Sequence, residues 1–172
     1  LFILGVLLCT TITFSQNLDS SLTSISNEFN DVTTKTTNIE RSIKEISSSI
    51  IQYTEITTQI KNGKSITEQY IFNPADIDLN TVKSVTNKDV IVVQLLVKNK
   101  QQLIKKIVDF NTTSYVNSIS INCNDVNNSR IIVESIKKII PIATQITDNR
   151  LSLKTYEEHM NWLIANIGDV AV

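Results

Sequence analysis

Residues 114–143, SYVNSISINCNDVNNSRIIVESIKKIIPIA, contain the clearest change of pattern in this sequence of 172 residues. In the first part of the stretch, apolar and polar residues alternate. In an extended chain Ile119 and Ile121 point to one side, and Ser118, Ser120 and Asn122 point to the other. This alternation predicts a strand with one buried face and one polar face.

The second part of the stretch predicts a long amphipathic helix. Asn124 or Asp125 is placed to cap the free backbone N–H groups at its start. Pro141 is expected to kink the helix or to end its regular part. A broad apolar stripe follows the cap at helical spacing, formed by Val126, Ile132, Val133, Ile136, Ile139, Ile140 and Ala143.

Extended patterns also lie upstream, after the turn signal Asn62-Gly63. They cover residues 65–72, 89–97, 102–108 and 114–122. The second and third runs are separated by polar residues 98–101 only, which predicts a hairpin. Residues 64–147 are therefore expected to form an α+β module, in which a small antiparallel sheet carries a long helix packed on one face.

A different pattern precedes this module, over residues 17–60. Apolar residues alternate there at spacings of four and three, with Thr36 in the one gap. The pattern predicts a long N-terminal amphipathic helix, or a helix hairpin with a break near Thr36. The seam positions are Leu18, Leu22, Ile25, Phe29, Val32, Ile39, Ile43, Ile46, Ile50 and Tyr53.

Two interpretations of this heptad pattern remain open. The seam could form a coiled coil that dimerises the protein, or the helices could pack against the neighbouring module. Flanking positions lack the alternating charges that select a coiled-coil partner, which favours packing within the chain.

The two ends of the sequence carry separate predictions. Residues 1–15 are uncharged and apolar at their start and end in Thr13-Phe14-Ser15, which predicts a front-truncated signal peptide cleaved after Ser15. Cleavage would leave Cys123 as the only thiol, so no intramolecular disulfide is expected. Residues 150–172 resemble the start of another helix-and-strand unit, which predicts a second, truncated module.

Three segments within the predicted module support a resemblance to known sequences. They are residues 70–78 (YIFNPADID), residues 101–105 (QQLIK) and residues 124–130 (NDVNNSR). Together they resemble a module repeated in uncharacterised secreted proteins of flavobacteria-like bacteria. The resemblance covers about residues 64–145 and implies export but no particular activity.

The charge composition argues against a nucleic-acid-binding function. The chain has 16 basic and 17 acidic residues, a formal net charge of −1, and therefore no electrostatic field to attract nucleic acid.

Asp76, Asp78 and Asn80 have the spacing of the first ligands of a calcium-binding loop. However, Thr81 and Asn87 stand where Gly and Glu are required, so no metal site is assigned. The segment is expected to form a structural turn that buries the apolar side chains of Ile77 and Leu79.

Other candidate groups have structural interpretations. The polar run 122–128 is explained by helix capping. Cys123 and His159 form the one available Cys–His pair, but no orienting group accompanies it. The lysines at 98, 100, 105 and 106 are typical of protected sheet edges. We therefore assign no catalytic, cofactor-binding or metal-binding residue, and we expect no cofactor.

The functional prediction is an exported, non-enzymatic module with a binding or structural role in the cell envelope or outside the cell. Its partner would be another protein or a second copy, bound through a sheet edge or the N-terminal helical seam. Neither nucleic acid binding nor a membrane span is expected in the mature chain. The alternatives are a coiled-coil adaptor that oligomerises a weakly binding α+β domain and, more distantly, a fragment of a secreted hydrolase.

Overall fold

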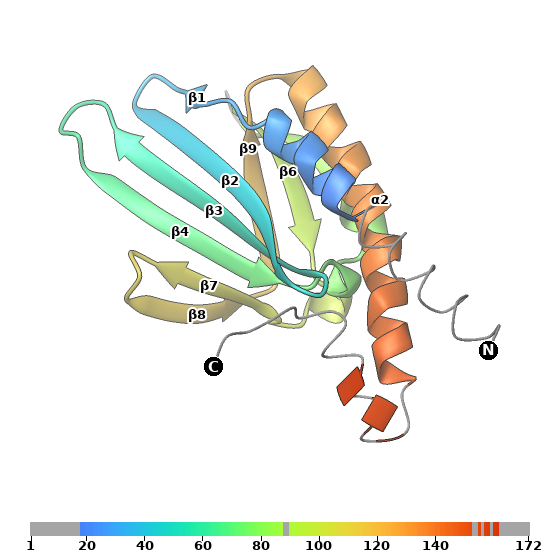
Figure 1. Ribbon diagram of the computed structural model, residues 1–172. Helices are drawn as coiled ribbons and strands as arrows, with labels where there is room; N and C mark the ends of the chain where they lie inside the picture. Colours follow the sequence, from blue (N-terminus) through green and yellow to red (C-terminus); the bar gives the residue numbers. More distant parts are fainter. Residues whose placement is uncertain (1–17, 88–89, 153–154, 156, 159, 162–172) are drawn as a thin grey trace.

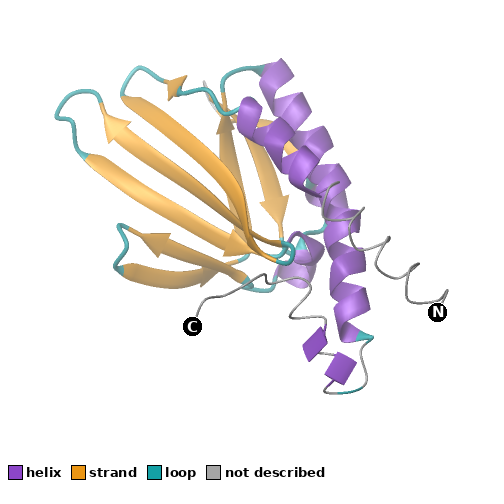
Figure 2. Cartoon of the chain, in the orientation of Figure 1, coloured by secondary structure: helices purple, strands orange, loops and turns teal. Residues whose placement is uncertain are grey.

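The computed structural model describes residues 18–87, 90–152, 155, 157–158 and 160–161. A short helix over residues 18–27 opens the described chain, nine strands form two antiparallel sheets, and a long helix follows them (Figures 1 and 2). Within the described residues no helix is long and apolar enough to cross a membrane.

The larger sheet has six strands in the order β1-β2-β3-β4-β7-β8. Its strands are β1 (Val32–Thr33), β2 (Thr37–Ser47), β3 (Ile50–Gln59), β4 (Ser65–Phe72), β7 (Ile104–Val108) and β8 (Thr112–Val116). The smaller sheet has the order β5-β6-β9 and contains β5 (Lys83–Asn87), β6 (Val90–Leu96) and β9 (Ser118–Cys123). Three short 3₁₀ turns, η1 (Pro74–Asp76), η2 (Leu79–Thr81) and η3 (Lys98–Lys100), connect strands, and α2 (Val126–Leu151) closes the fold.

The chain passes from one sheet to the other at three places. After β4 in the larger sheet, the turns η1 and η2 lead to β5 in the smaller sheet. After β6, the turn η3 leads to β7 in the larger sheet, and β8 continues almost directly into β9 in the smaller sheet. Asn117 is the corner residue of the β8–β9 crossing, and its carbonyl accepts a hydrogen bond from the Val97 backbone N–H at 2.9 Å. The three crossings join the sheets around a shared hydrophobic core.

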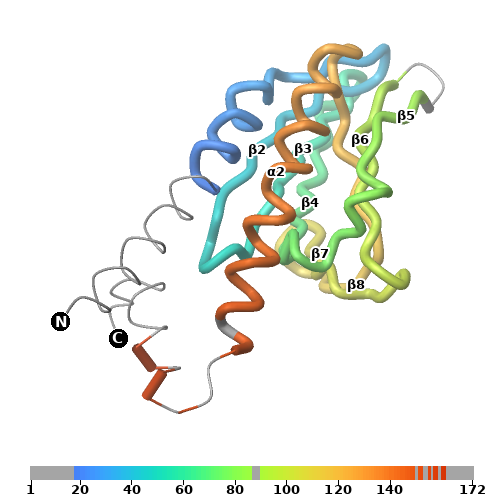
Figure 3. Tube along the Cα trace, turned by 90° about the vertical axis from the view of Figure 1, so that its right-hand side faces the viewer, coloured from blue at the N-terminus to red at the C-terminus, as the bar shows by residue number. Residues whose placement is uncertain are grey.

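The hydrophobic core joins both sheets to both helices. On α2 its members include Ile132 and Ile139, and on the 18–27 helix Leu18 and Ile25, all of them 0–1% exposed. The α2 helix contacts β5, β6 and β9, while the 18–27 helix lies beside α2 in Figures 1 and 3. Further core residues from the strands are Ile51, Tyr53, Phe72, Val93, Leu95, Ile104, Ile119, Ile121 and Cys123.

The prediction of a helix or helix hairpin over residues 17–60 is wrong beyond residue 27. Strands β1, β2 and β3 occupy the remainder of the segment. A spacing of four keeps Ile39 and Ile43 on one face in a strand as well as in a helix, so that spacing does not distinguish the two. A spacing of three moves Ile46 to the opposite strand face, where it is 44% exposed.

The residue types in this segment explain the outcome. Thr and Ile are abundant, and β-branched side chains favour the pleated strand over the helix. A tight turn at Ser48-Ser49, with Ser49 at a φ of 66°, joins β2 to β3. Within the helix that does form, Leu18, Leu22 and Ile25 are buried in the core of their own chain. Of the two interpretations of the seam, these residues fit packing within the chain and not a coiled coil.

The predicted fold class also needs correction in its sheet architecture. The module has two sheets of six and three strands rather than one small sheet, although it remains α+β. Strand β4 has the predicted bounds, 65–72, whereas the run 114–122 is split into β8 and β9. The expected hairpin around residues 98–101 is wrong, because β6 and β7 belong to different sheets.

The closing helix agrees with its predicted start. The Asp125 carboxylate accepts a hydrogen bond from the Asn128 backbone N–H at 2.7 Å, which is the expected N-terminal cap. Pro141 lies inside the helix, which continues to Leu151, so the expectation that the proline ends the helix is wrong. Residues 1–15 lie outside the described residues, as does most of the segment 150–172 assigned to a second module.

The buried side of the 18–27 helix gives a direct test of this arrangement. Replacement of Ile25, which is 0% exposed, by Ala should lower the free energy of unfolding by about 2–5 kcal/mol, because the substitution leaves a cavity in the core. Urea denaturation followed by circular dichroism measures the change. The matched variant Thr23→Ala, at an exposed position of the same helix, should unfold like the wild type, and an equal loss in both variants would contradict the packing.

Candidate functional site

A polar cleft of about 500 Å³ lies where the two sheets diverge. Its floor is a face of the larger sheet, and its wall is the bent β8–β9 segment. The lining residues are Glu55, Glu68, Tyr70, Gln102, Lys106, Tyr115, Val116, Asn117, Ser118, Ser120 and Asn122. We take this cleft as the candidate functional site, because concave surfaces with converging polar groups are where ligands bind.

The floor is organised by the register of β3 against β4. Tyr53 pairs directly with Tyr70, and Glu55 pairs directly with Glu68. Residues two apart on a strand share a face, so all four side chains lie on one face of the sheet. The antiparallel register thus places two tyrosines side by side and two carboxylates side by side.

Burial changes along this face. Ile51 and Tyr53 on β3 are 1% and 0% exposed, whereas Glu55 is half-buried. On β4, Phe72 is buried and Tyr70 and Glu68 are half-buried. The tyrosines therefore occupy the boundary between the hydrophobic core and the cleft, and the carboxylates lie on the cleft side.

Each tyrosine donates a hydrogen bond to the carboxylate two residues away on its own strand. The Tyr53 hydroxyl lies 2.7 Å from Glu55 Oε2, and the Tyr70 hydroxyl lies 2.7 Å from Glu68 Oε2. The two rings are stacked, with centroids 6.0 Å apart and an interplanar angle of 28°. The result is a near-symmetrical arrangement of two Tyr–Glu pairs across neighbouring strands.

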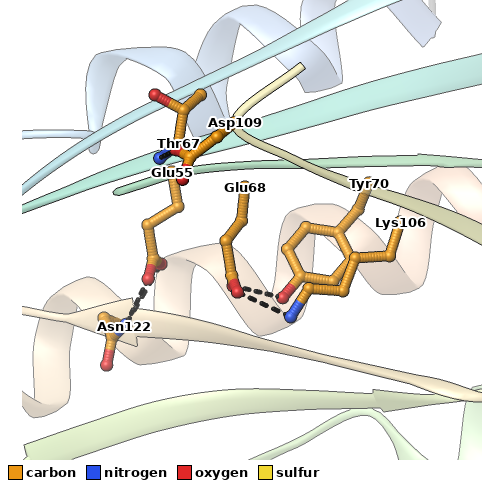
Figure 4. A network of polar contacts seen from close by, with 7 residues as sticks. All are labelled: Glu55, Thr67, Glu68, Tyr70, Lys106, Asp109 and Asn122. Atoms are coloured by element: carbon orange, nitrogen blue, oxygen red, sulfur yellow. Dashed lines mark hydrogen bonds and ion pairs between the residues drawn. The ribbon is translucent and has the colours of Figure 1, made fainter. Parts of the chain in front are cut away.

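Two further side chains complete the arrangement, as Figure 4 shows. Lys106 on β7 forms an ion pair with Glu68 at 2.6 Å and lies 5.2 Å from the centre of the Tyr70 ring. Asn122 on β9 donates from its side-chain nitrogen to both oxygens of Glu55, at 3.1 and 3.0 Å. The second contact links the floor of the larger sheet to the smaller sheet.

Arg41 supports the cleft from the adjacent strand. It pairs in register with Glu55, is 8% exposed, and lies 4.8 Å above the Phe29 ring. Its guanidinium donates to the backbone carbonyl of Asn122 and, at 2.5 Å, to that of Asn30. Asn122 is therefore held through its backbone by Arg41 and through its side chain by Glu55.

Burial shifts the pKa values of the ionisable groups around the floor. Desolvation raises the pKa of Tyr70 to about 12, and the hydrogen bond to Glu68 adds to the effect. Desolvation and the neighbouring Glu55 charge raise the pKa of Tyr53 well above its usual value. Both phenols therefore stay protonated at neutral pH and act as donors to the carboxylates.

The pKa values of the two nearby cations, Lys106 and Arg41, are also shifted. Desolvation lowers the pKa of Lys106, but its contacts with Glu68 and Tyr70 outweigh this and raise the pKa overall. Desolvation lowers the pKa of Arg41. A guanidinium nevertheless stays charged in proteins. Arg41, paired in register with Glu55, and Lys106, in contact with Glu68, therefore place one positive charge beside each carboxylate.

The residues expected to form the calcium-like segment act as turn caps. Asp78 accepts a hydrogen bond from the Asn80 backbone N–H at 3.0 Å and caps η2. Ile77 is fully buried, as the structural interpretation expected, but Leu79 is 42% exposed, which corrects that interpretation. Within the described residues no group of three or more His, Cys, Asp and Glu side chains is placed to hold a metal ion.

The remaining predicted candidates are the Cys123–His159 pair and the four lysines. Cys123 is 3% exposed in the core, and desolvation raises its pKa to about 11, so it is a weak nucleophile. His159 lies outside the described residues, so the Cys–His pair stays untested. Of the four lysines, Lys106 is a cleft residue, whereas Lys98 donates to the Ala75 carbonyl at 2.6 Å.

Helix capping was the interpretation of the polar run 122–128, and the structure agrees with it for Asp125 and Asn128. Asn128 is 5% exposed, and its side chain donates to the Glu28 carbonyl at 2.7 Å, which ties the start of α2 to the end of the 18–27 helix. Asn122 is the exception in this run, because its side chain lies in the cleft rather than at the helix start.

The sequence analysis did not identify the two Tyr–Glu pairs as part of a site. The signal was present as Tyr53-Thr54-Glu55 and Glu68-Gln69-Tyr70, two mirror-image triplets with a strand period of two. The first triplet was hidden by the helical interpretation of residues 17–60. No match to this chain is found among protein-family models, curated proteins or solved structures.

The raised pKa of Tyr70 predicts a pH-dependent stability. A tyrosine in an unfolded chain has a pKa of about 10, so the folded state favours the neutral phenol. The stabilisation is fully present below pH 10 and is lost as pH rises towards the folded value of about 12. In urea denaturations at several pH values, the stability difference between wild type and Tyr70→Phe should therefore shift in favour of the variant above about pH 10. A difference independent of pH would contradict the assigned burial.

Proposed function

We propose that this chain is an exported, non-enzymatic binding module whose cleft takes a small polar ligand that donates hydrogen bonds. The observation that carries the proposal is the pair of carboxylates, Glu55 and Glu68, directly opposite each other on the cleft floor. Export is proposed on the sequence of residues 1–15.

The remaining hydrogen-bonding capacity of the carboxylates supports this ligand chemistry. An ionised carboxylate offers about four lone-pair positions. Glu55 accepts from Tyr53 and Asn122, and Glu68 accepts from Tyr70 and Lys106, so each retains acceptor capacity. Hydroxyl and amine groups of a ligand are the matching donors.

The walls extend the same chemistry. Ser118 and Ser120 on β9 offer hydroxyls that both donate and accept, and Gln102 offers an amide. The lining carries two carboxylates and one ammonium group, which favours neutral or cationic ligands over anions.

A binding role fits these groups better than a catalytic role. Both carboxylates are engaged in contacts that hold them in place, which is the preorganisation that a binding site requires. The thiol of Cys123 is buried and protonated at neutral pH, so it offers no nucleophile to the cleft.

The test uses ¹⁵N-labelled protein and NMR titration with two probe sets, neutral mono- and disaccharides and primary amines. A ligand of the proposed class should shift the side-chain amide signals of Gln102 and Asn122. Glu55→Gln should weaken binding of that probe by roughly tenfold or more, because a charged acceptor is lost. The matched variant Glu134→Gln changes an exposed glutamate on α2 and should bind like the wild type.

Two results would overturn the proposal. One is that neither probe set shifts the cleft signals at millimolar concentration. The other is that Glu55→Gln and Glu134→Gln bind the same probe equally well.

A further inference from the structure

Among the strands that the structure describes, β8 forms an open edge of the larger sheet. It is 5 residues long, Thr112–Val116, and pairs with β7 in an unbroken register over its full length. It contains no charged residue and no proline, and its first four residues are exposed. Natural edge strands usually carry lysines, prolines or bulges that stop another chain from pairing, and β8 has none of these.

The opposite edge of this sheet is different. There β1 has only 2 residues, which is too short to template a second strand. In the smaller sheet the edge strand β5 begins with Lys83 and contacts α2. The other edge strand of the smaller sheet, β9, faces the larger sheet, where Arg41 donates to the Asn122 backbone carbonyl and Glu55 accepts from the Asn122 side chain. Within the described residues, β8 is therefore the edge best suited to pairing.

The turn before β8 holds an exposed aromatic ring. Phe110 is 72% exposed at the tip of the β7–β8 hairpin, and it has a φ of 60° next to Asp109 with a φ of 47°. Positive φ values at two non-glycine residues cost free energy, so surrounding contacts must hold the turn. The ring is thus placed at the end of the open edge by a strained turn.

Those contacts come from the neighbouring strand β4. The Asp109 backbone N–H donates to the Thr67 carbonyl at 2.8 Å, and the Thr67 backbone N–H donates to the Asp109 carboxylate at 2.9 Å (Figure 4). Across the turn, the Asn111 backbone N–H donates to the Val108 carbonyl at 3.1 Å. The tip is therefore preorganised rather than free to fold its ring onto the protein.

We propose that β8 pairs antiparallel with β8 of a second copy about a two-fold axis at Ser114, which joins the two larger sheets into one. The strand is self-complementary in this register. Thr113 lies opposite the other copy's Tyr115, and Thr112 lies opposite the other copy's Val116. Aromatic–Thr cross-strand pairs are favourable, and an uncharged strand places no like charges opposite each other.

A second copy explains the exposed ring as well as the open edge. In the same register Phe110 comes next to the corner where the other copy's β8 turns into β9. That corner includes Asn117 and Ser118, which line the cleft, so each ring would cover one margin of its neighbour's cleft. An interface of this length is smaller than that of a permanent dimer, so association is expected to be weak and visible only at high concentration.

Sedimentation velocity over about 5 to about 500 µM protein tests the association. The wild type should shift from monomer towards dimer as concentration rises. Thr113→Glu, which places charge on the edge, should remain monomeric, whereas Thr86→Glu, the same change at an exposed position of edge strand β5, should dimerise like the wild type. Phe110→Ser should weaken the dimer, and circular dichroism checks that every variant is folded.

A disulfide test fixes the register. Directly opposite residues of an antiparallel pair have Cα atoms about 4.5–5.5 Å apart, within the range that a disulfide spans. Oxidation should therefore cross-link Ser114→Cys and leave Thr112→Cys monomeric on a non-reducing gel. A wild type that stays monomeric at the highest concentration, a dimer unaffected by Thr113→Glu, or preferential cross-linking at position 112 would overturn the proposal.

Discussion

The arrangement of the cleft depends on a constraint in its floor, the pairing of Glu55 with Glu68 across β3 and β4. Like charges at directly opposite positions destabilise a sheet unless other groups compensate for them. Here each carboxylate accepts from a tyrosine hydroxyl, Lys106 neutralises one of them, and Asn122 donates to the other. Since Asn122 belongs to the smaller sheet, satisfying these two carboxylates also fixes how the sheets meet.

Packing in the hydrophobic core at one end of β3 and β4 positions the cleft residues at the other end. Tyr53 is fully buried and forms a T-shaped contact with the Phe29 ring, and the Arg41 guanidinium lies over the Phe29 ring. The helix over residues 18–27 and α2 cover the interior on that side and leave the cleft side uncovered. The same strands thus supply core residues at one end and cleft residues at the other, and rigid packing at the first end holds the side chains at the second.

Parts of this organisation could be predicted from sequence because they rest on local signals. The alternation in residues 118–122 gave a strand with buried Ile119 and Ile121, and Asp125 capped the helix as its position indicated. The cleft could not be predicted, because it depends on which strands are neighbours and in what register. Glu55 and Glu68 are opposite each other only because β3 and β4 form a hairpin. Strands β2 and β3 were not predicted, because the spacing of Ile39 and Ile43 fits a helix as well as a strand.

The link between Glu55 and Asn122 is the most direct test of this account, since it joins the carboxylate floor to the other sheet. A double-mutant cycle with Glu55→Ala, Asn122→Ala and the double variant, measured by urea unfolding at pH 7, isolates their interaction free energy. The account predicts a favourable coupling of about 1–2 kcal/mol, as expected for a hydrogen bond to a charged acceptor in a half-buried site. A coupling within about 0.3 kcal/mol of zero would mean that the two sheets are held together without the carboxylate floor, and would contradict the account.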